Sequence, residues 1–267
     1  MKPATKPIFI EAVGLAAPGL PSWQQARAAL RGEQPCENTP LPPHTPALLP
    51  ANERRRATPA IRLAFQAAED AMQGTSIPAA NLATVFASSD ADLGIIHRIS
   101  LALTASPRFI SPTDFHNSVH NAAAGYWSIA VGSRAASTTI SAYDGSFAAG
   151  LLEASLLVEV DACDVLLVAF DLPAPEPLHA KRPIAHPVAV ALVLTQQATA
   201  KTLAALSCAT TMEPETLLPD AALESLRSGN PAARALPLLQ RLAARDFGRV
   251  ILPNANSRNL AVDLHAP

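Results

Sequence analysis

The feature that most constrains the fold is a strand–turn–helix–strand unit at residues 138–171. TTISAY reads as a strand, GSFAAGLLEASLLV as a helix of mostly small residues, and VLLVAFD as a second strand. The second strand lacks polar alternation, so both of its faces must be covered, as in the parallel sheets of α/β proteins. Similar alternation along the chain predicts an α/β fold with a mostly parallel or mixed sheet flanked by helices.

Other segments extend this pattern. IFIEAV predicts a strand that ends in the turn residues Gly14 to Gly19, and Thr58 with Pro59 starts a helix with one apolar face. SPTDF at 111–115 predicts a loop. After Thr202 the pattern weakens, with AALESLRS and ARALPLLQRLAAR indicating helices and GRVILPNA and LAVDLHAP indicating strands. No composition break divides the chain, so we expect one domain over 1–267.

Composition excludes several classes of function. The net charge is -2, and the ERRR stretch from Glu53 to Arg56 is the main basic cluster, so neither a nucleic-acid nor a membrane-surface role is favoured. Three widely separated cysteines give no zinc or disulfide pattern and fit a reducing compartment. The N-terminus lacks a signal-peptide pattern, and no apolar run is long enough to span a bilayer. We therefore expect a cytoplasmic protein without a membrane span.

The turn between the 138–143 strand and the following helix is a candidate site. Such turns often hold a nucleophile at a helix N-terminus, where backbone N–H groups favour negative charge. Here the predicted apex residue is Asp144. An exposed carboxylate at a helix N-terminus is stabilised by about 0.3–1 kcal/mol, so we expect Asp144 to cap the helix. It is a poor acyl acceptor, because transfer from a thioester would give an unstable mixed anhydride.

Several segments in order resemble the N-terminal half of a β-ketoacyl synthase of the thiolase-like fold. They are IFIEAVGLAAPGLPSWQQARAALRGEQP, ERRRATPAIRLAFQAAEDAM, TVFASSDADLG and NSVHNAAAGYWSIAVGSRAASTTISAYDGSFAAGLLEA. The resemblance covers about residues 7–200 and leaves 201–267 as a divergent tail. The family elbow usually reads Ala-Cys, and the resemblance implies that Asp144 takes the place of this cysteine. Active synthases also carry a pair of C-terminal histidines, whereas the tail offers His265 outside any matching motif.

The resemblance is strongest to non-catalytic chain-length factors, in particular the short partner subunits of aryl-polyene synthases. It implies a subunit without catalytic residues or a metal, which pairs with an active β-ketoacyl synthase and shapes the acyl tunnel in polyene, polyketide or fatty-acid-type elongation. No cofactor is implied beyond the phosphopantetheine thioester that an acyl carrier protein brings. That carrier protein would bind transiently, and the synthase would form a heterodimer with this chain.

In the family, the subunits meet through the sheet edge and the small-residue helix before the elbow, and the tunnel runs along this interface. The resemblance therefore implies interface or tunnel-wall positions at Asn117, His120, Asn121, Tyr126, Trp127, Tyr143 and Phe147. Core positions for Tyr126 and Trp127 are equally compatible with the pattern, and the histidines of FHNSVHN also fit a role in anchoring a loop.

Two alternatives stay open. A free-standing acyltransferase or malonyl-thioester decarboxylase would use Asp144 as acid or base, which requires a buried carboxyl with a raised pKa and a second polar group. A carrier-protein-binding module without a synthase is also compatible with the pattern, although weak net charge argues against it because carrier proteins are acidic. The product, the chain length, the partner's identity, the choice between homodimer and heterodimer, and the role of the tail are left open.

Overall fold

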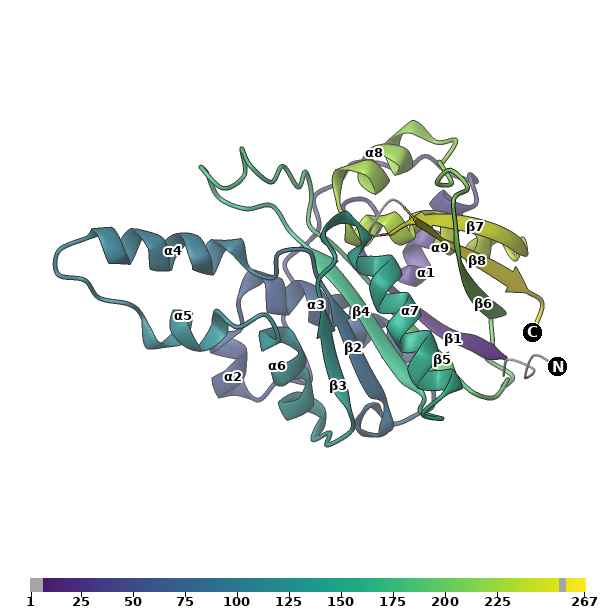
Figure 1. Ribbon diagram of the computed structural model, residues 1–267, viewed down its shortest axis with the longest axis horizontal. Coiled ribbons are helices and arrows are strands. Elements are labelled where there is room, and N and C mark those ends of the chain that lie inside the picture. The colour runs from purple at the N-terminus through teal and green to yellow at the C-terminus, as the bar shows by residue number, and fades with distance from the viewer. Residues whose placement is uncertain (1–6, 255–257) are drawn as a thin grey trace.

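The computed structural model describes residues 7–254 and 258–267, which form one mixed sheet of eight strands with helices on both faces (Figure 1). The strands are β1 (Ile8–Ala16), β2 (Ala83–Ala87), β3 (Ser137–Ile140), β4 (Val165–Asp171), β5 (Val188–Thr195), β6 (Ala204–Thr211), β7 (Gly248–Pro253) and β8 (Asn259–His265). The helices are α1 (Trp23–Leu30), α2 (Ala51–Arg56), α3 (Pro59–Gly74), α4 (Leu93–Thr104), α5 (Pro112–Asn117), α6 (Ala122–Val131), α7 (Ser146–Glu159), α8 (Ala221–Gly229) and α9 (Leu236–Ala244), with 3-10 turns η1 (Ala79–Asn81), η2 (Tyr143–Gly145) and η3 (Ala232–Ala235).

The strand order is β3-β2-β4-β5-β1-β6-β8-β7. Strand β2 pairs in parallel with both β3 and β4, whereas every other neighbouring pair is antiparallel. The parallel pairs occur where helices cross over between strands, namely α4 to α6 before β3 and α7 before β4. The predicted α/β class is confirmed in its mixed form, and parallel pairing is confined to three strands.

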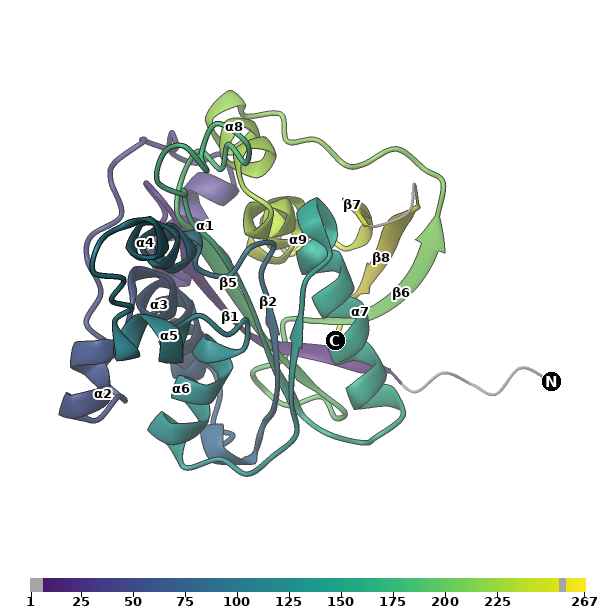
Figure 2. The same cartoon turned by 60° about the vertical axis from the view of Figure 1, so that its left-hand side comes forward.

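Helices cover both faces of the sheet. On one face α3 packs against β1, β5 and β4, and α6 packs beside it over β2. On the other face α7 lies over β4 and β2, and α1, α8 and α9 complete the layer (Figure 2). The predicted start of α3 is confirmed, since the Thr58 hydroxyl accepts a hydrogen bond from Ile61 N and Pro59 opens the helix. No helix in the described ranges is both long and apolar enough to cross a bilayer.

The tail after Thr202 extends the sheet. Strand β6 pairs with β1, β8 pairs with β6, and β7 forms the outer edge, while α8 and α9 cover one face. The two helices and two strands indicated by the sequence are all present as α8, α9, β7 and β8. Strand β6 was not predicted, because AALSCATT is small and half-exposed and lacks the apolar run of the central strands.

Two local predictions are wrong. Gly14 lies inside β1, not in a turn, because α3 crosses the strand there so closely that a Cβ atom would lie 1.9 Å from the Ala67 carbonyl oxygen. SPTDF is not a loop but the start of α5. Its Ser111 hydroxyl accepts a hydrogen bond from Asp114 N, and Pro112 occupies the first helical position, which is a helix-start pattern that the sequence analysis overlooked.

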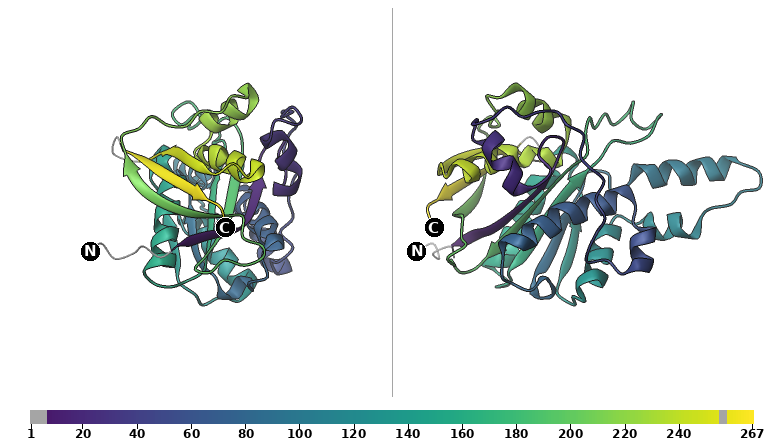
Figure 3. Two further views of the ribbon diagram at one scale, coloured as in Figure 1. Left: turned by 90° about the vertical axis from the view of Figure 1, so that its right-hand side faces the viewer. Right: turned by 180° about the vertical axis from the view of Figure 1, so that it is seen from behind.

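Helices α4 and α5 form a hairpin that projects beyond the sheet, here named the arm (residues 93–117) (Figures 1 and 3). The Arg98 guanidinium donates to both carboxylate oxygens of Asp114, at 3.1 and 2.7 Å, and this pairing holds the pKa of Asp114 below its usual range. Ile95 is the only buried residue of α4. The arm and the segment after it expose the large apolar side chains Ile96, Leu101, Leu103, Phe109, Phe115 and Val119.

We predict that Gly14→Ala lowers the free energy of unfolding by about 1–3 kcal/mol, because its methyl group would overlap the α3 backbone. Gly125→Ala in α6 is the matched control. A Cβ atom there meets nothing within 4 Å, so better helix propensity should raise stability by about 0.5–1 kcal/mol. Urea unfolding followed by circular dichroism measures both changes. Equal stabilities for the two variants would contradict the close α3–β1 packing.

Candidate functional site

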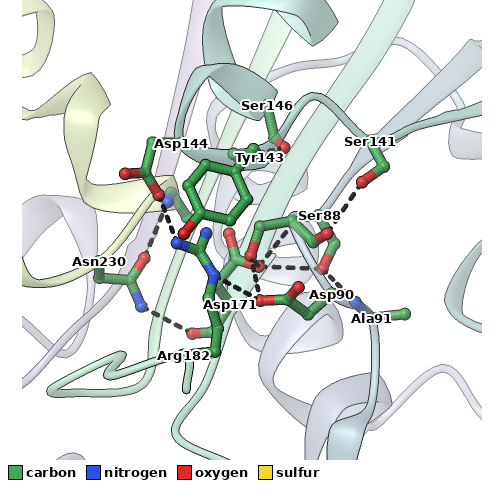
Figure 4. Close-up of polar contacts among 12 residues, drawn as sticks. Ser88, Asp90, Ala91, Ser141, Tyr143, Asp144, Ser146, Asp171, Arg182 and Asn230 are labelled. Carbon is green, nitrogen blue, oxygen red and sulfur yellow. Dashed lines mark hydrogen bonds and ion pairs between the residues drawn. The ribbon is translucent and has the colours of Figure 1, made fainter. Parts of the chain in front are cut away.

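The candidate site lies at the edge of the sheet where the parallel strands β2, β3 and β4 reach their C-terminal ends. Ligands of open α/β sheets characteristically bind at this edge. Strand β3 ends at Ile140, the 3-10 turn η2 follows, and α7 begins at Ser146, which forms the predicted strand–turn–helix elbow. Figure 4 shows the polar side chains that gather around it.

The apex of the elbow is at Tyr143, one residue before the predicted apex. Tyr143 has a left-handed backbone with φ of 53°, a conformation that non-glycine residues rarely adopt. Ser146 stabilises the turn, because its hydroxyl accepts a hydrogen bond from Ala142 N at 3.0 Å and donates to Tyr143 O at 2.7 Å. The predicted helix cap is also wrong. Gly145 is the N-cap of α7 without a side-chain hydrogen bond, and the Asp144 carboxylate turns to an arginine instead.

That arginine is Arg182, from the proline-rich crossing between β4 and β5. Its Nη1 lies 2.7 Å from Asp144 Oδ1, and its Nε lies 2.8 Å from Asp90 Oδ2. The guanidinium carbon lies 3.7 Å from the centroid of the Tyr143 ring (Figure 4). Burial acts to lower the pKa of Arg182, but the two carboxylates outweigh it and the pKa is raised. We call Arg182 with Asp90, Tyr143 and Asp144 the Arg182 clamp.

A buried carboxyl lies behind the clamp. Asp171 ends β4 and is almost fully shielded from solvent. Its Oδ1 accepts hydrogen bonds from Ser88 Oγ at 3.0 Å, Ser89 N at 2.8 Å and Ser89 Oγ at 2.7 Å. Burial raises its pKa to about 7, although the serine hydrogen bonds act to lower it. The Ser89 hydroxyl is also 2.8 Å from Asp90 Oδ2, and it therefore connects the buried acid to the clamp.

None of the three cysteines lies at the elbow. Cys36 lies beside Gly19, and Cys163 precedes β4 at the end of the sheet opposite the elbow. Cys208 is in β6, where burial raises the pKa of its thiol to about 11 and makes it unreactive. Within residues 7–254 and 258–267, no cluster of three histidine, cysteine or acidic side chains is arranged to hold a metal ion.

Three predicted interface residues belong to the core of the chain itself. Trp127 is fully buried in α6 and packs edge-on against Phe65, with ring centroids 5.2 Å apart. Tyr126 lies in the same cluster, and Phe147 is a buried residue of α7 on the other face of the sheet. Their burial favours the core interpretation over an exposed interface.

The other predicted residues lie in two separate places. Asn117 is buried at the end of α5, where its Nδ2 donates to Arg56 O at 3.0 Å. His120 is half-buried, and Asn121 is exposed at the start of α6 without a side-chain cap bond. Tyr143 is exposed at the elbow. The structure therefore brings Tyr143 and Asp144 together but places the residues of FHNSVHN at the base of the arm.

Sequence reasoning missed Arg182, Asp90, Asp171 and Asn230. Asn230 fixes the crossing that carries Arg182, because its Nδ2 donates to Asp171 O at 2.9 Å and to His186 O at 2.7 Å. Arg182 and Asp90 are 92 positions apart, so no local pattern relates them. Asp171 did leave a signal, because an acidic residue directly ending a fully apolar strand is unusual and calls for buried partners.

The sequence model of the family described as the β-ketoacyl synthase N-terminal domain matches residues 22–248. No curated protein matches the chain in sequence. A chain in the structure of the ketosynthase ApeO in complex with its chain length factor ApeC, from Xenorhabdus doucetiae, aligns with a TM-score of 0.72 at 25% identity, over 96% of this chain and 99% of that chain.

Two more solved structures show the same fold. A chain of the ishigamide ketosynthase/chain length factor aligns with a TM-score of 0.76 at 13% identity, over 97% of this chain and 99% of that chain. A β-ketoacyl synthase from Burkholderia phymatum STM815 aligns with a TM-score of 0.70 at 13% identity, over 98% of this chain and 100% of that chain. The predicted thiolase-like fold is thereby confirmed.

The raised pKa of Asp171 predicts a pH dependence of stability. Between about pH 4 and 7 the folded protein keeps a proton that the unfolded chain has lost, so this group makes stability fall as pH rises and level off above about 7. Asp171→Asn removes this dependence, so the variant should gain up to about 4 kcal/mol relative to wild type across that range.

Urea unfolding at several pH values measures the effect. Asp114→Asn is the control, because the pKa of Asp114 is lowered and its contribution is lost only as the pH falls through the ordinary carboxyl range or below. Parallel stability profiles for wild type and Asp171→Asn would show that folding does not raise the pKa of Asp171.

Proposed function

The chain belongs to the family of β-ketoacyl synthase N-terminal domains, and from this premise we propose that it is a non-catalytic, chain-length-factor-like subunit. It would assemble with an active β-ketoacyl synthase and shape the tunnel in which an acyl chain of the polyene, polyketide or fatty-acid type grows. The observation that carries this proposal is the elbow, which has a strained turn followed by a helix. In place of a thiol, the turn carries Tyr143 and Asp144, and both side chains contact Arg182.

The Arg182 clamp explains why this elbow would not transfer an acyl group. Forming an acyl-enzyme thioester needs a free thiolate at the turn. Here the nearest anionic group, Asp144, is ion-paired to a guanidinium that is itself largely buried, with 13% of its side chain exposed. The same guanidinium covers the Tyr143 ring. At the elbow, Arg182 therefore pairs with the carboxylates of Asp90 and Asp144 and contacts the Tyr143 ring.

The apolar arm supports a protein partner. Phe109 and Phe115 are 72% and 70% exposed, and four further large apolar side chains of the region are exposed with them. Grouped exposed apolar residues of this size mark interaction surfaces. Strand β3 is also an edge of the sheet on the same side of the molecule (Figure 1). The ApeO–ApeC structure is that of a ketosynthase with its chain length factor, which is the kind of partner we propose for this surface.

The proposed partners also define the substrate. The growing chain would arrive as a phosphopantetheine thioester on an acyl carrier protein, and no other cofactor is proposed. A type II polyketide carrier protein in complex with its ketosynthase is the subject of another structure that shares this fold, with a TM-score of 0.77 at 14% identity. We expect all of these proteins in the cytoplasm.

An enzyme that uses Asp144 as acid or base is less compatible with the geometry. That mechanism requires a buried carboxyl with a raised pKa beside an open pocket. The structure has such a carboxyl at Asp171, but its side chain is shielded behind Ser88 and Ser89. Asp144 is 44% exposed and engaged by Arg182.

Co-expression with the β-ketoacyl synthase encoded nearest to this chain tests the proposal. We expect the two proteins to co-purify, and elongation of a carrier-bound chain to be lost without this subunit. Asp144→Ala should keep the elongation rate within about twofold, since the carboxylate does no chemistry. Elongation by the synthase alone at the full rate, or its loss in Asp144→Ala while the complex stays intact, would contradict the proposal.

The arm predicts which substitution separates the subunits. Phe115→Asp should weaken the complex by about tenfold or more, because it places a charge in a desolvated apolar contact. Met212→Asp is the matched control, since Met212 is 75% exposed and follows β6 at the opposite end of the molecule. Affinity measured by surface plasmon resonance should be unchanged in the control. Equal effects of the two variants would exclude the arm as the contact surface.

A further inference from the structure

Three segments meet at the base of the arm around a small cavity. Asp92 is the N-cap of α4, Asn117 ends α5, and His120 directly precedes α6. All three residues line a cavity of about 10 Å³, together with residues from the start of α3 and with Phe170 of β4. The cavity therefore lies where the arm joins the helix layer and the sheet.

Each of these residues has one buried side-chain polar atom that forms no hydrogen bond with residues 7–254 and 258–267. The atoms are Asp92 Oδ2, Asn117 Oδ1 and His120 Nε2. Asp92 and Asn117 are oriented by their other polar atom. Asp92 Oδ1 accepts from Ile95 N at 3.1 Å and caps α4, and Asn117 Nδ2 donates to Arg56 O at 3.0 Å. Buried polar groups without partners are costly and rare, so three around one cavity indicate a ligand.

The chemistry of the three atoms matches one water molecule. A water can donate its two hydrogens to Asp92 Oδ2 and Asn117 Oδ1 while it accepts a hydrogen bond from His120 Nε2. The cavity has the volume of about one water, and buried waters typically make about three such bonds.

We infer that this cavity binds a single structural water that fixes the arm to the rest of the molecule. The other attachments of the arm are Ile95, which is the only buried residue of α4, and the direct bond from Asn117 Nδ2 to Arg56 O, whereas the Arg98–Asp114 pair connects α4 only to α5. A water held by Asp92, Asn117 and His120 connects the start of α4, the end of α5 and the approach to α6. Asn117 and His120 are then positioning residues for the arm, whatever partner the arm contacts.

A crystal structure at high resolution tests the site directly. We expect density for one water at about 2.6–3.2 Å from each of the three atoms. A cavity without density would overturn the inference, and so would a metal cation at the shorter distances of about 2.0–2.4 Å from the oxygens.

Hydrogen exchange of the intact chain tests the positioning role. His120→Ala removes one partner of the water, so amides of α4 (Leu93–Thr104) should exchange about tenfold faster than in wild type. Asn117 is left unchanged in this test because its Nδ2 also bonds directly to Arg56 O. His120→Gln keeps an N–H donor and should restore slow exchange. Asn121→Ala is the matched control, because Asn121 is exposed and makes no side-chain cap bond.

The exchange of α3 separates this effect from general unfolding. The inference requires that α3 (Pro59–Gly74) keeps its wild-type exchange in the variants while α4 accelerates. Equal exchange of α4 in His120→Ala and Asn121→Ala, or equal acceleration of α3 and α4, would overturn it. Binding to a synthase is not part of this readout, so its outcome is independent of the proposed function.

Discussion

Burial of the central strands on both faces is the constraint on which the structure depends. Every residue of β4 and β5 is buried, so neither face of the sheet can be left to solvent. Helix α3 covers one face, and α7 with α1, α8 and α9 covers the other. The tail therefore supplies a helix layer that the resemblance to a full synthase would assign to a second half. Most of the exposed large apolar side chains lie on the arm and on the outer sides of α6 and α7, and none lies on the central strands β4 and β5.

The small residues of α7 are explained by the same constraint. A Cβ atom at Gly150 would lie 2.9 Å from Ala87 Cβ, so α7 approaches β2 as closely as a glycine permits. This approach places the N-terminus of α7 and the elbow beside the ends of β2 and β4, where Asp90 and Asp171 lie. Close helix packing therefore brings the clamp residues within reach of one another.

Most helices and strands could be predicted from local sequence signals. The contacts of the candidate site could not, because they join residues that are far apart in the sequence. Buried strands such as VLLVAFD and a helix start such as Thr58–Pro59 carry their structure in adjacent residues. The apex of the elbow was misplaced by one residue, and the residue that contacts both Tyr143 and Asp144 is Arg182, 38 positions beyond Asp144. Arg182 lies in the proline-rich connection between β4 and β5, which shows no periodicity. Its contacts with Asp90 and Asp144 therefore could not be predicted from any local stretch of the sequence.

The strained elbow needs a reason to persist in a site that lacks a nucleophile. A non-glycine residue in the left-handed region costs about 1–3 kcal/mol, and the surrounding structure must hold it there. Ser146 bonds both sides of the turn, and Arg182 binds the side chains of Tyr143 and Asp144. These contacts fix the turn without offering a reactive group. An elbow that is stabilised without a thiol is consistent with the proposed non-catalytic subunit, whose surface and not its chemistry would border the growing chain.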